Sequence, residues 1–311
     1  MKKYLLGLLM LCGLAQAQPA GDFHQHLFSP TVAELVKVQP ISATDLISML
    51  DDAGIKRATL LSVAYTFGSP KRSFPDELAR VRAENDWTAA QAAKYPGRLM
   101  AFCSFNPLKD YALGELARCA AHPGLKHGIK LHFGNSDVQL EQPAHLERMK
   151  QVFKAANDHH MAIVVHMRAS ISQNRPYGAQ QARIFLEQLL PQAPDVTVQV
   201  AHFAGAGPGY DDPAGEEAMG VLAEAVQHGD PRARKLWFDI ASLPDGKLTK
   251  EQEQRLVARI RQVGVSRVLY GSDAAAGNNL RPLEGWAAFL SLPLTEDEVA
   301  IVSTNLPPYW R

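Results

Sequence analysis

The chain has 311 residues, with 32 basic and 32 acidic side chains and no formal net charge at neutral pH. Without the first 17 residues, which include two lysines, 32 − 2 = 30 basic and 32 acidic side chains remain, a formal charge of −2. This balance gives no electrostatic case for binding nucleic acid or an anionic membrane surface. The remaining 311 − 17 = 294 residues are enough to bury one large hydrophobic core.

The N-terminus has the features of a secretory signal peptide. A basic start, "MKK", precedes the apolar run "YLLGLLMLCGL", and "AQA" at 15–17 offers the small residues that a signal peptidase needs. The apolar run is too short to span a bilayer. We therefore expect cleavage after Ala17, export to the periplasm, and no membrane attachment of the mature chain, residues 18–311.

Short apolar runs alternate with helical patterns along the mature chain. The predicted strands lie at 21–27, 57–64, 98–106, 127–134, 161–168, 196–205, 235–242 and 267–275. Most are nearly continuous in apolar residues, which is typical of strands buried on both faces. The predicted helices lie at 42–54, 75–97, 108–121, 143–160, 178–190, 214–229, 249–263 and 295–303. Eight strands alternating with eight helices predict an α/β fold, a single-domain (β/α)8 TIM barrel over residues 18–311.

Two cysteines remain after cleavage. Cys103 lies in a predicted strand and Cys119 near the end of a predicted helix. We expect two buried thiols, and a disulfide is the alternative if the protein reaches an oxidising compartment.

Polar side chains interrupt five of the predicted strands near their carboxyl ends, where a barrel of this kind carries its active site. They are His24, His26, Lys130, His132, His166, Arg168, His202 and Asp273. Each alone has a plain structural explanation, such as a hydrogen-bonded core histidine, a lysine that reaches solvent or a helix-capping aspartate. Burying all of them together without partners would cost several kcal/mol. A metal ion would satisfy imidazole and carboxylate lone pairs together, so the pattern predicts a metal site.

The order of the motifs resembles the amidohydrolase superfamily, in particular its amidohydrolase-2 branch. The matching motifs are "HQH" at 24–26, "GIKLH" at 128–132, "VVHMR" at 164–168, "VAHFAG" at 200–205 and "YGSDA" at 270–274. This branch includes metal-dependent hydrolases and non-oxidative decarboxylases of the aminocarboxymuconate-semialdehyde decarboxylase type. The resemblance extends over the whole mature chain.

The resemblance implies a set of metal ligands: His24, His26, His166 and Asp273. It also implies that His202 is catalytic in single-metal relatives and a ligand in two-metal relatives. Lys130 stands where two-metal relatives hold a carboxylated lysine. We expect one divalent ion, Zn²⁺ first, with a second ion held through Lys130 and His202 as the alternative.

The expected chemistry is hydrolysis by a metal-activated water. Asp273 would move the proton, and His202 would orient the water or stabilise the developing oxyanion. Arg168 is expected either to bind a substrate carboxylate or to form an ion pair at the rim. His132 is expected to contact the substrate, and Asp239 is a weaker candidate for orienting a histidine.

Three functions remain open at this point. The first is an exported hydrolase that cleaves a C–N or C–O bond of a small molecule. The second is a metal-dependent decarboxylase of a carboxylated aromatic or muconate-like acid, and the third is a metal-loaded barrel that only binds a ligand. The oligomeric state is not predicted, and the aromatic tail "PPYWR" at 307–311 is expected to dock on a neighbouring molecule or on its own barrel.

Overall fold

The computed structural model describes residues 18–275, 277 and 279–311, and in it the predicted strands form one parallel sheet. The spatial order of the strands follows the chain from β1 to β8. Their bounds are β1 Asp22–Gln25, β2 Ala58–Leu61, β3 Leu99–Ser104, β4 Gly128–His132, β5 Ala162–His166, β6 Val198–Val200, β7 Leu236–Asp239 and β8 Val268–Leu269. The N–H of Phe23 donates to the carbonyl of Tyr270 at 2.9 Å, and the N–H of Asp273 donates to the carbonyl of His24 at 2.9 Å. The first strand therefore meets the segment after the last one, and the sheet is a nearly closed barrel.

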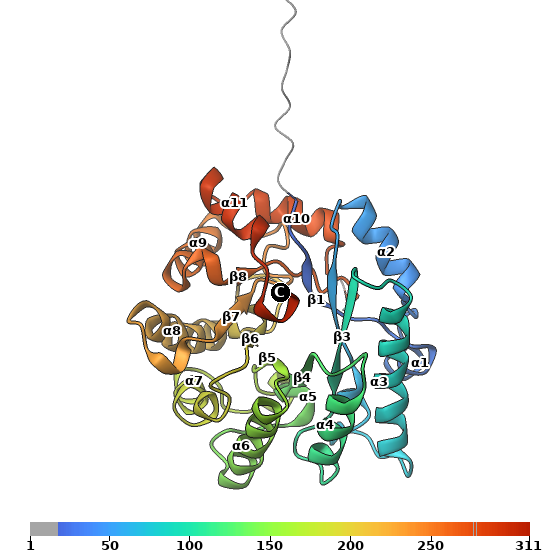
Figure 1. The fold of residues 1–311 in the computed structure, drawn as a ribbon. Coiled ribbons are helices and arrows are strands. Elements are labelled where there is room, and N and C mark those ends of the chain that lie inside the picture. Colours follow the sequence, from blue (N-terminus) through green and yellow to red (C-terminus); the bar gives the residue numbers. More distant parts are fainter. Residues whose placement is uncertain (1–17, 276, 278) are drawn as a thin grey trace, which may run out of the picture.

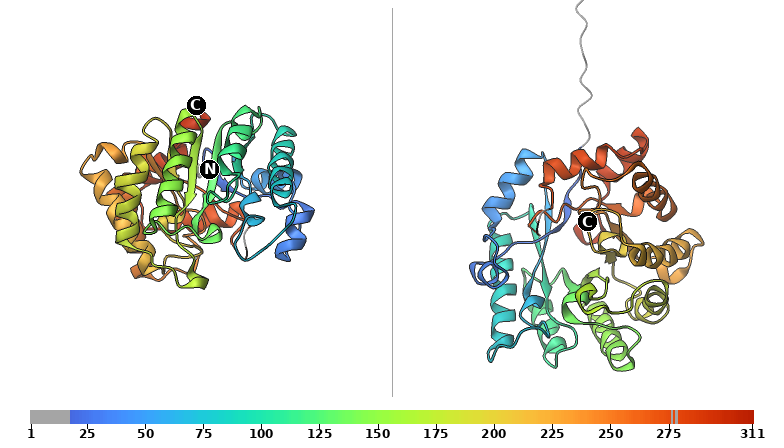
Figure 2. Two further views of the ribbon diagram at one scale, coloured as in Figure 1. Left: turned by 90° about the horizontal axis from the view of Figure 1, so that it is seen from below. Right: turned by 180° about the vertical axis from the view of Figure 1, so that it is seen from behind.

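The helices form a ring around the strands (Figures 1 and 2). Their bounds are α1 Pro30–Val36, α2 Ala43–Asp52, α3 Glu77–Ala93, α4 Ala112–Ala121, α5 Phe133–Ser136, α6 Pro143–Asp158, α7 Ala179–Ile184, α8 Pro213–Gln227, α9 Lys250–Val263, α10 Pro282–Leu290 and α11 Glu296–Thr304. The longer helices bury apolar side chains on one face; in α9 these are Leu256, Val257, Ile260 and Val263. The α/β barrel predicted from the alternating pattern is thus the observed architecture.

The helix predictions were incomplete after the first, fourth and last strands. The helix expected at 295–303 is α11, but α10 precedes it, and neither α1 nor α5 was predicted; α5 begins inside the strand expected at 127–134. All three are short, and α1 and α10 begin with a proline in the first turn, Pro30 after the capping Ser29 and Pro282 in α10. Gly285 in the middle of α10 lowers its helix propensity, which explains why the pattern was weak there.

The expectation of two free thiols was wrong. Cys103 of β3 and Cys119 of α4 form a disulfide, with their Cα atoms 6.2 Å apart. This separation lies within the range that a disulfide spans without moving the backbone. The alternative given by the sequence is therefore the observed one.

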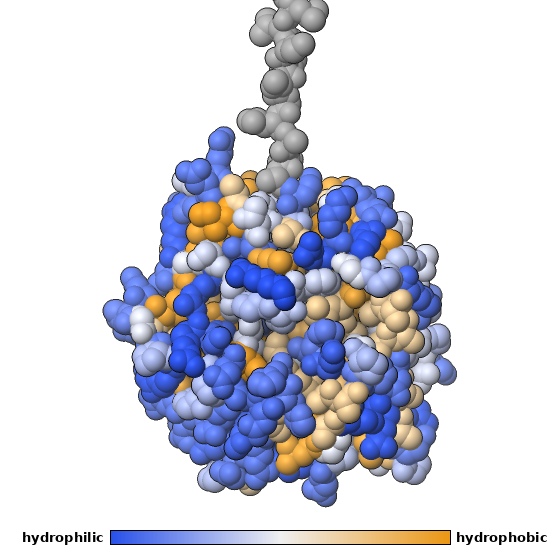
Figure 3. All heavy atoms as spheres, viewed as in Figure 1, coloured by the Kyte–Doolittle hydropathy of each residue, from blue (hydrophilic) through white to orange (hydrophobic). Residues whose placement is uncertain are grey.

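The C-terminal tail docks on its own barrel, at the end opposite the carboxyl ends of the strands. The indole N–H of Trp310 donates to the hydroxyl of Thr59 at 2.9 Å, and the ring of Tyr309 lies 5.0 Å from that of Phe102. Figure 1 looks onto this end, where the C-terminus lies in front of the centre of the ring. The surrounding surface is largely hydrophilic, with scattered apolar residues (Figure 3).

Two predictions about membranes and export have different outcomes. No helix among the described residues is both long and apolar enough to cross a bilayer. The predicted signal peptide, 1–17, lies outside the described residues, so cleavage and export stay predictions.

Candidate metal centre

The predicted histidines converge at the carboxyl ends of the strands. The ring centroid of His24 lies 5.3 Å from that of His26 and 4.6 Å from that of His202. The ring of His166 lies 5.0 Å from that of His202 and stacks on that of His132 at 4.1 Å. The barrel therefore brings side chains from β1, β4, β5 and the turn after β6 to one place.

Hydrogen bonds at Nδ1 fix the tautomers of three of these histidines. His24 Nδ1 lies 3.0 Å from Asp239 Oδ2, His26 Nδ1 lies 2.6 Å from the Leu61 carbonyl, and His202 Nδ1 lies 2.8 Å from the Ala241 carbonyl. Because each partner is an acceptor, each Nδ1 carries the proton and each Nε2 keeps its lone pair. Metal-binding histidines are oriented in the same way.

A carboxylate oxygen beside these lone pairs has no partner. Asp273 Oδ1 is buried and makes no hydrogen bond among the described residues, although it lies 3.6 Å from His26 Nε2. Its other oxygen accepts from the side-chain amide of Asn279 at 3.1 Å. Ligand atoms of His24, His26 and Asp273 lie within 4.8 Å of one another. Imidazole nitrogens and a buried unpartnered carboxylate oxygen are donors that a divalent cation would satisfy, so these residues fit a metal ion.

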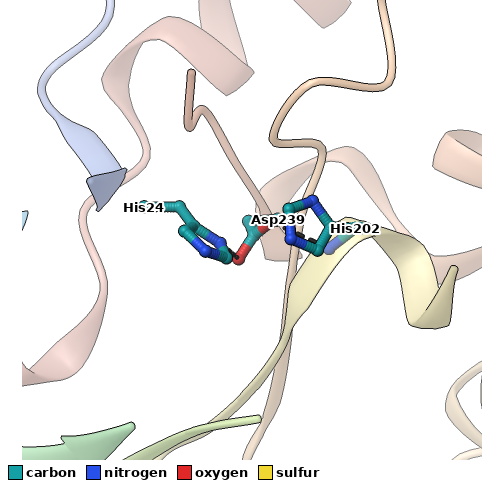
Figure 4. A group of neighbouring side chains, drawn as sticks. All are labelled: His24, His202 and Asp239. Atoms are coloured by element: carbon teal, nitrogen blue, oxygen red, sulfur yellow. Dashed lines mark hydrogen bonds and ion pairs between the residues drawn. The ribbon is translucent and has the colours of Figure 1, made fainter. Parts of the chain in front are cut away.

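Asp239, at the end of β7, is the centre of the hydrogen bonding around this group (Figure 4). Its Oδ2 accepts from His24 Nδ1 and, at 2.7 Å, from the side-chain amide of Gln199. Its Oδ1 accepts from the backbone N–H groups of His202 at 2.9 Å and Ala241 at 3.2 Å. Burial alone would raise the pKa of Asp239, but its interactions with His24 and His202 hold that pKa below its usual range. The sequence rated Asp239 as a weak candidate, whereas the structure makes it the partner of two histidines.

The electrostatic environment favours neutral histidines. Burial, together with the charge of Lys130, lowers the pKa of His24 to about 3. Burial is also the main reason why the pKa values of His26, His166 and His202 lie below their ordinary value. Neutral imidazole is the form that binds metal, so the site does not need to release protons from these rings when a cation enters.

His202 and Asp273 do not lie on strands, contrary to the prediction. β6 ends at Val200 and β8 at Leu269, and both residues lie in the turns that follow. Their φ angles are +50° and +52°, in the left-handed region that side chains other than glycine rarely adopt. Such conformations cost about 1–3 kcal/mol each and persist where the surrounding structure holds them. The Asp239 carboxylate holds His202 in this conformation, because it accepts a hydrogen bond from the backbone N–H of His202.

His166 and His132 occupy a different part of the cluster. His166 is not part of either three-residue group of close ligand atoms around His24 that the described residues form, so its role as a ligand stays a prediction. His132 Nδ1 accepts from the backbone N–H of Asn135 at 3.2 Å, so its proton is on Nε2. His132 is therefore a hydrogen-bond donor at Nε2, and its contact with the substrate stays a prediction.

The two predicted cations have different surroundings. Lys130 is buried, and its Nζ lies 3.2 Å from His24 Nε2, which places it inside the cluster. Burial lowers the pKa of Lys130. Arg168 donates from Nε to Asp212 at 2.7 Å and stacks over the ring of Tyr177, so the expected ion pair at the rim is present. Substrate binding by Arg168 stays a prediction.

A cavity of about 290 Å³ opens beside the cluster. Its lining includes His132, His166, Arg168 and Lys71, and none of the acidic side chains that the structure describes lines it. Lys71 donates to the hydroxyl of Ser172 at 2.6 Å and is in no ion pair among the described residues. We call this space the cationic cavity. Sequence reasoning missed Lys71, because its loop between β2 and α3 has no regular pattern.

Comparisons with known proteins address the family and the fold of the chain. The family model for amidohydrolases matches residues 22–303, and no curated protein sequence matches the chain. Similar solved structures include 5-carboxyvanillate decarboxylase from Sphingomonas paucimobilis, with 16% identity, a TM-score of 0.63, and coverage of 92% of this chain and 96% of that one.

Two other solved structures with a similar fold are named for different reactions. A dihydroxybenzoic acid decarboxylase from a Polaromonas species, with bound manganese and 2-nitroresorcinol, has 14% identity, a TM-score of 0.64, and coverage of 92% of this chain and 95% of that one. A probable 2-pyrone-4,6-dicarboxylic acid hydrolase from Acinetobacter baumannii, with bound citric acid, has 17% identity, a TM-score of 0.58, and coverage of 92% and 96%. Identities this low establish the fold alone.

Family membership rests on the sequence match, which spans nearly the whole barrel. The donor set around His24 fits a divalent metal ion. The chain therefore belongs to the amidohydrolase family, in its amidohydrolase-2 branch.

Proposed function

We propose that this protein is a metal-dependent decarboxylase that removes carbon dioxide from a small carboxylated molecule, such as a hydroxylated aromatic acid. The observation that carries the proposal is the cationic cavity, whose charged lining residues in the described part of the chain are Lys71 and Arg168. Arg168 is paired with Asp212, whereas Lys71 forms no ion pair with a described residue and would meet an anionic substrate beside the metal centre. This reverses the order expected from the sequence, in which hydrolysis came first.

The position of the negative group follows from a comparison of two cavities. A second space of about 280 Å³ shares Arg168 with the cationic cavity, but its lining includes Asp211, Asp212 and Glu216. A carboxylate would be repelled there, whereas Lys71 and the Nε2–H of His132 would attract it in the cationic cavity. A volume near 300 Å³ lies at the small end of ligand sites and suits a single substituted ring.

Each residue of the cluster has a proposed role. His24, His26, His166 and Asp273 would hold one divalent ion, with Zn²⁺ or Mn²⁺ suited to these donors. The bound ion supplies a Lewis acid for the oxygens of the substrate. In the reaction the bond between the carboxyl carbon and the ring breaks, its electron pair stays on the ring carbon, and that carbon takes a proton. We assign the delivery of this proton to Asp273, which would take it up from solvent. His202, whose Nε2 keeps its lone pair, would accept a hydrogen bond from a substrate hydroxyl rather than stabilise an oxyanion.

Hydrolysis is the second candidate. It is favoured by Lys130, whose Nζ lies 3.2 Å from His24 Nε2 and which, if carboxylated, would supply oxygen ligands for a second ion. In that case His202 would be a ligand of the second ion. One of the structural neighbours is named as a probable hydrolase, which also supports this candidate.

The test combines metal content with product analysis. The chain, loaded separately with Zn²⁺ and Mn²⁺, is offered 2,6-dihydroxybenzoate and 5-carboxyvanillate, and carbon dioxide release is measured. A parallel panel of lactones, esters and amides is followed by acid release. Carbon dioxide release that His24→Ala abolishes supports the decarboxylase, and acid release alone would reject it in favour of the hydrolase.

Metal stoichiometry distinguishes the two centres. About one equivalent that is lost in His24→Ala and kept in Lys130→Ala supports a single ion. Two equivalents that fall to one in Lys130→Ala support the lysine-bridged pair. Export after cleavage at Ala17 is a separate proposal, tested by the N-terminal sequence of the mature protein.

A further inference from the structure

A continuous chain of hydrogen bonds links the C-terminal tail to the metal cluster through the interior of the barrel. The hydroxyl of Tyr309 donates to Gln199 Oε1 at 2.7 Å. Gln199 Nε2 donates to Asp239 Oδ2 at 2.7 Å, and the same oxygen accepts from His24 Nδ1 at 3.0 Å. The tail residue and the metal cluster lie toward opposite ends of the barrel, so three hydrogen bonds connect them.

The direction of each bond is determined by its neighbours. Gln199 Nε2 faces two acceptors, Asp239 Oδ2 and, at 3.1 Å, the carbonyl of Phe23. Turning the amide over would place Gln199 Oε1 against both of these oxygens. Oε1 therefore points to the tail, where the Tyr309 hydroxyl is its donor. Gln199 is fully buried, so removing that donor leaves an oxygen without water to replace it.

We propose that Tyr309 is a positioning residue for the metal centre, acting through Gln199 and Asp239 on His24. The Tyr309 hydroxyl holds the Gln199 amide in the orientation that donates to Asp239. Asp239 in turn keeps the His24 proton on Nδ1, so the lone pair that a cation would use is on Nε2, which faces Lys130 Nζ at 3.2 Å. The proposal concerns the metal centre and does not depend on which reaction it catalyses.

The tail offers a matched pair of variants. Tyr309→Phe keeps the ring that packs on Phe102 and removes only the hydroxyl. Trp310→Phe removes the indole N–H that donates to Thr59, which also hydrogen-bonds Tyr309, but it keeps the Tyr309 hydroxyl that donates to Gln199. Both variants lose hydrogen bonding of the tail, so any effect shared by the two is structural.

The first readout is the dissociation constant for Zn²⁺ and Mn²⁺, measured by chelator competition on the metal-free full chain. When a group that is hydrogen-bonded directly to a metal-binding histidine is mutated, metal affinity falls by about 10–100-fold. Tyr309 acts two bonds further away, so we expect Tyr309→Phe to weaken binding by up to about 10-fold. The dissociation constants of Trp310→Phe should stay within about twofold of the wild-type values. The second readout is the visible spectrum of the Co²⁺ form, which reports ligand geometry and should change only in Tyr309→Phe.

A double-mutant cycle tests the route. If Tyr309 acts through Gln199, Tyr309→Phe should add nothing to the loss of metal affinity in Gln199→Met. The proposal is overturned if Tyr309→Phe binds both ions as the wild type does with an unchanged Co²⁺ spectrum. It is also overturned if Trp310→Phe weakens binding equally, or if the effects of Tyr309→Phe and Gln199→Met are additive.

Discussion

Replacing Asp239 with asparagine should disable the metal centre while barely changing the shape of the site. All four hydrogen bonds to the Asp239 carboxylate come from donors, two at each oxygen. Asparagine has one carbonyl oxygen and one NH2 group, so in either orientation the NH2 group of its amide faces a pair of donors. Each orientation has a definite consequence.

With the amide at the Oδ2 position, it faces His24 and Gln199. His24 can keep a hydrogen bond there only by accepting at Nδ1, which moves its proton to Nε2 and removes the lone pair that a metal would use. With the amide at the Oδ1 position, the backbone N–H groups of His202 and Ala241 lose their acceptor. Each buried donor left unpaired costs about 1–3 kcal/mol, so this orientation should destabilise the fold by roughly 2–6 kcal/mol.

The expected result for Asp239→Asn is therefore a fall in metal affinity of about 10–100-fold, which corresponds to about 1.4–2.7 kcal/mol. Metal titration measures the affinity, and urea unfolding of the metal-free chain measures stability. Glu115→Gln is the matched control, because Glu115 is also fully buried and accepts from Asn85 and Arg118, but contacts none of the clustered histidines. It should lose stability and keep its metal affinity. Wild-type affinity in Asp239→Asn, or an equal loss in Glu115→Gln, would refute the reasoning.

Three further predictions address other parts of the molecule. Burial raises the pKa of Glu84 from 4.5 to about 7, so between these pH values the native state holds a proton that the unfolded chain releases. The free energy of unfolding should therefore fall by roughly 3 kcal/mol as the pH rises from 4.5 to 7. Urea unfolding of Glu84→Gln should show a flatter dependence of this free energy on pH. Lys71→Gln should raise KM for a carboxylated substrate about fivefold with little change in kcat, whereas Lys71→Arg should keep the wild-type KM. Equal KM values for Lys71→Gln and the wild type in steady-state assays would contradict a role in binding. Reduction of the Cys103–Cys119 disulfide should lower the free energy of unfolding by about 3 kcal/mol, since the cysteines are 16 residues apart; identical urea midpoints with and without reductant would argue against it.

The parts of the site that sequence could predict are those that regular structure positions. Lys130 and His132 lie on β4 and His166 ends β5, where the apolar pattern placed them. A parallel barrel gathers strand ends at one mouth, so these residues had to approach each other once the strands were identified. The same rule placed His24 and His26 beside them.

The residues that sequence misplaced depend on backbone geometry and distant contacts. His202 and Asp273 lie in left-handed turns, which no apolar periodicity encodes for residues other than glycine. Asp239 is 215 positions from His24, so its central role required the closed barrel. The tail was recognised as a docking segment, but the hydrogen bond from Tyr309 to Gln199 depends on the depth to which the tail enters the barrel.

The strained turns and the metal cluster are stabilised by the same groups. The backbone N–H of His202 donates to Asp239, and that of Asp273 donates to the carbonyl of His24, so each left-handed residue is tied to another member of the cluster. At about 1–3 kcal/mol each, the two conformations are a cost that the barrel offsets only while these bonds hold. A change that releases Asp239 should therefore relax the His202 turn as well as free the His24 ring. Metal affinity and the local stability of the barrel mouth are consequently coupled. We therefore expect a bound cation to raise the free energy of unfolding by more than the contribution of any single contact.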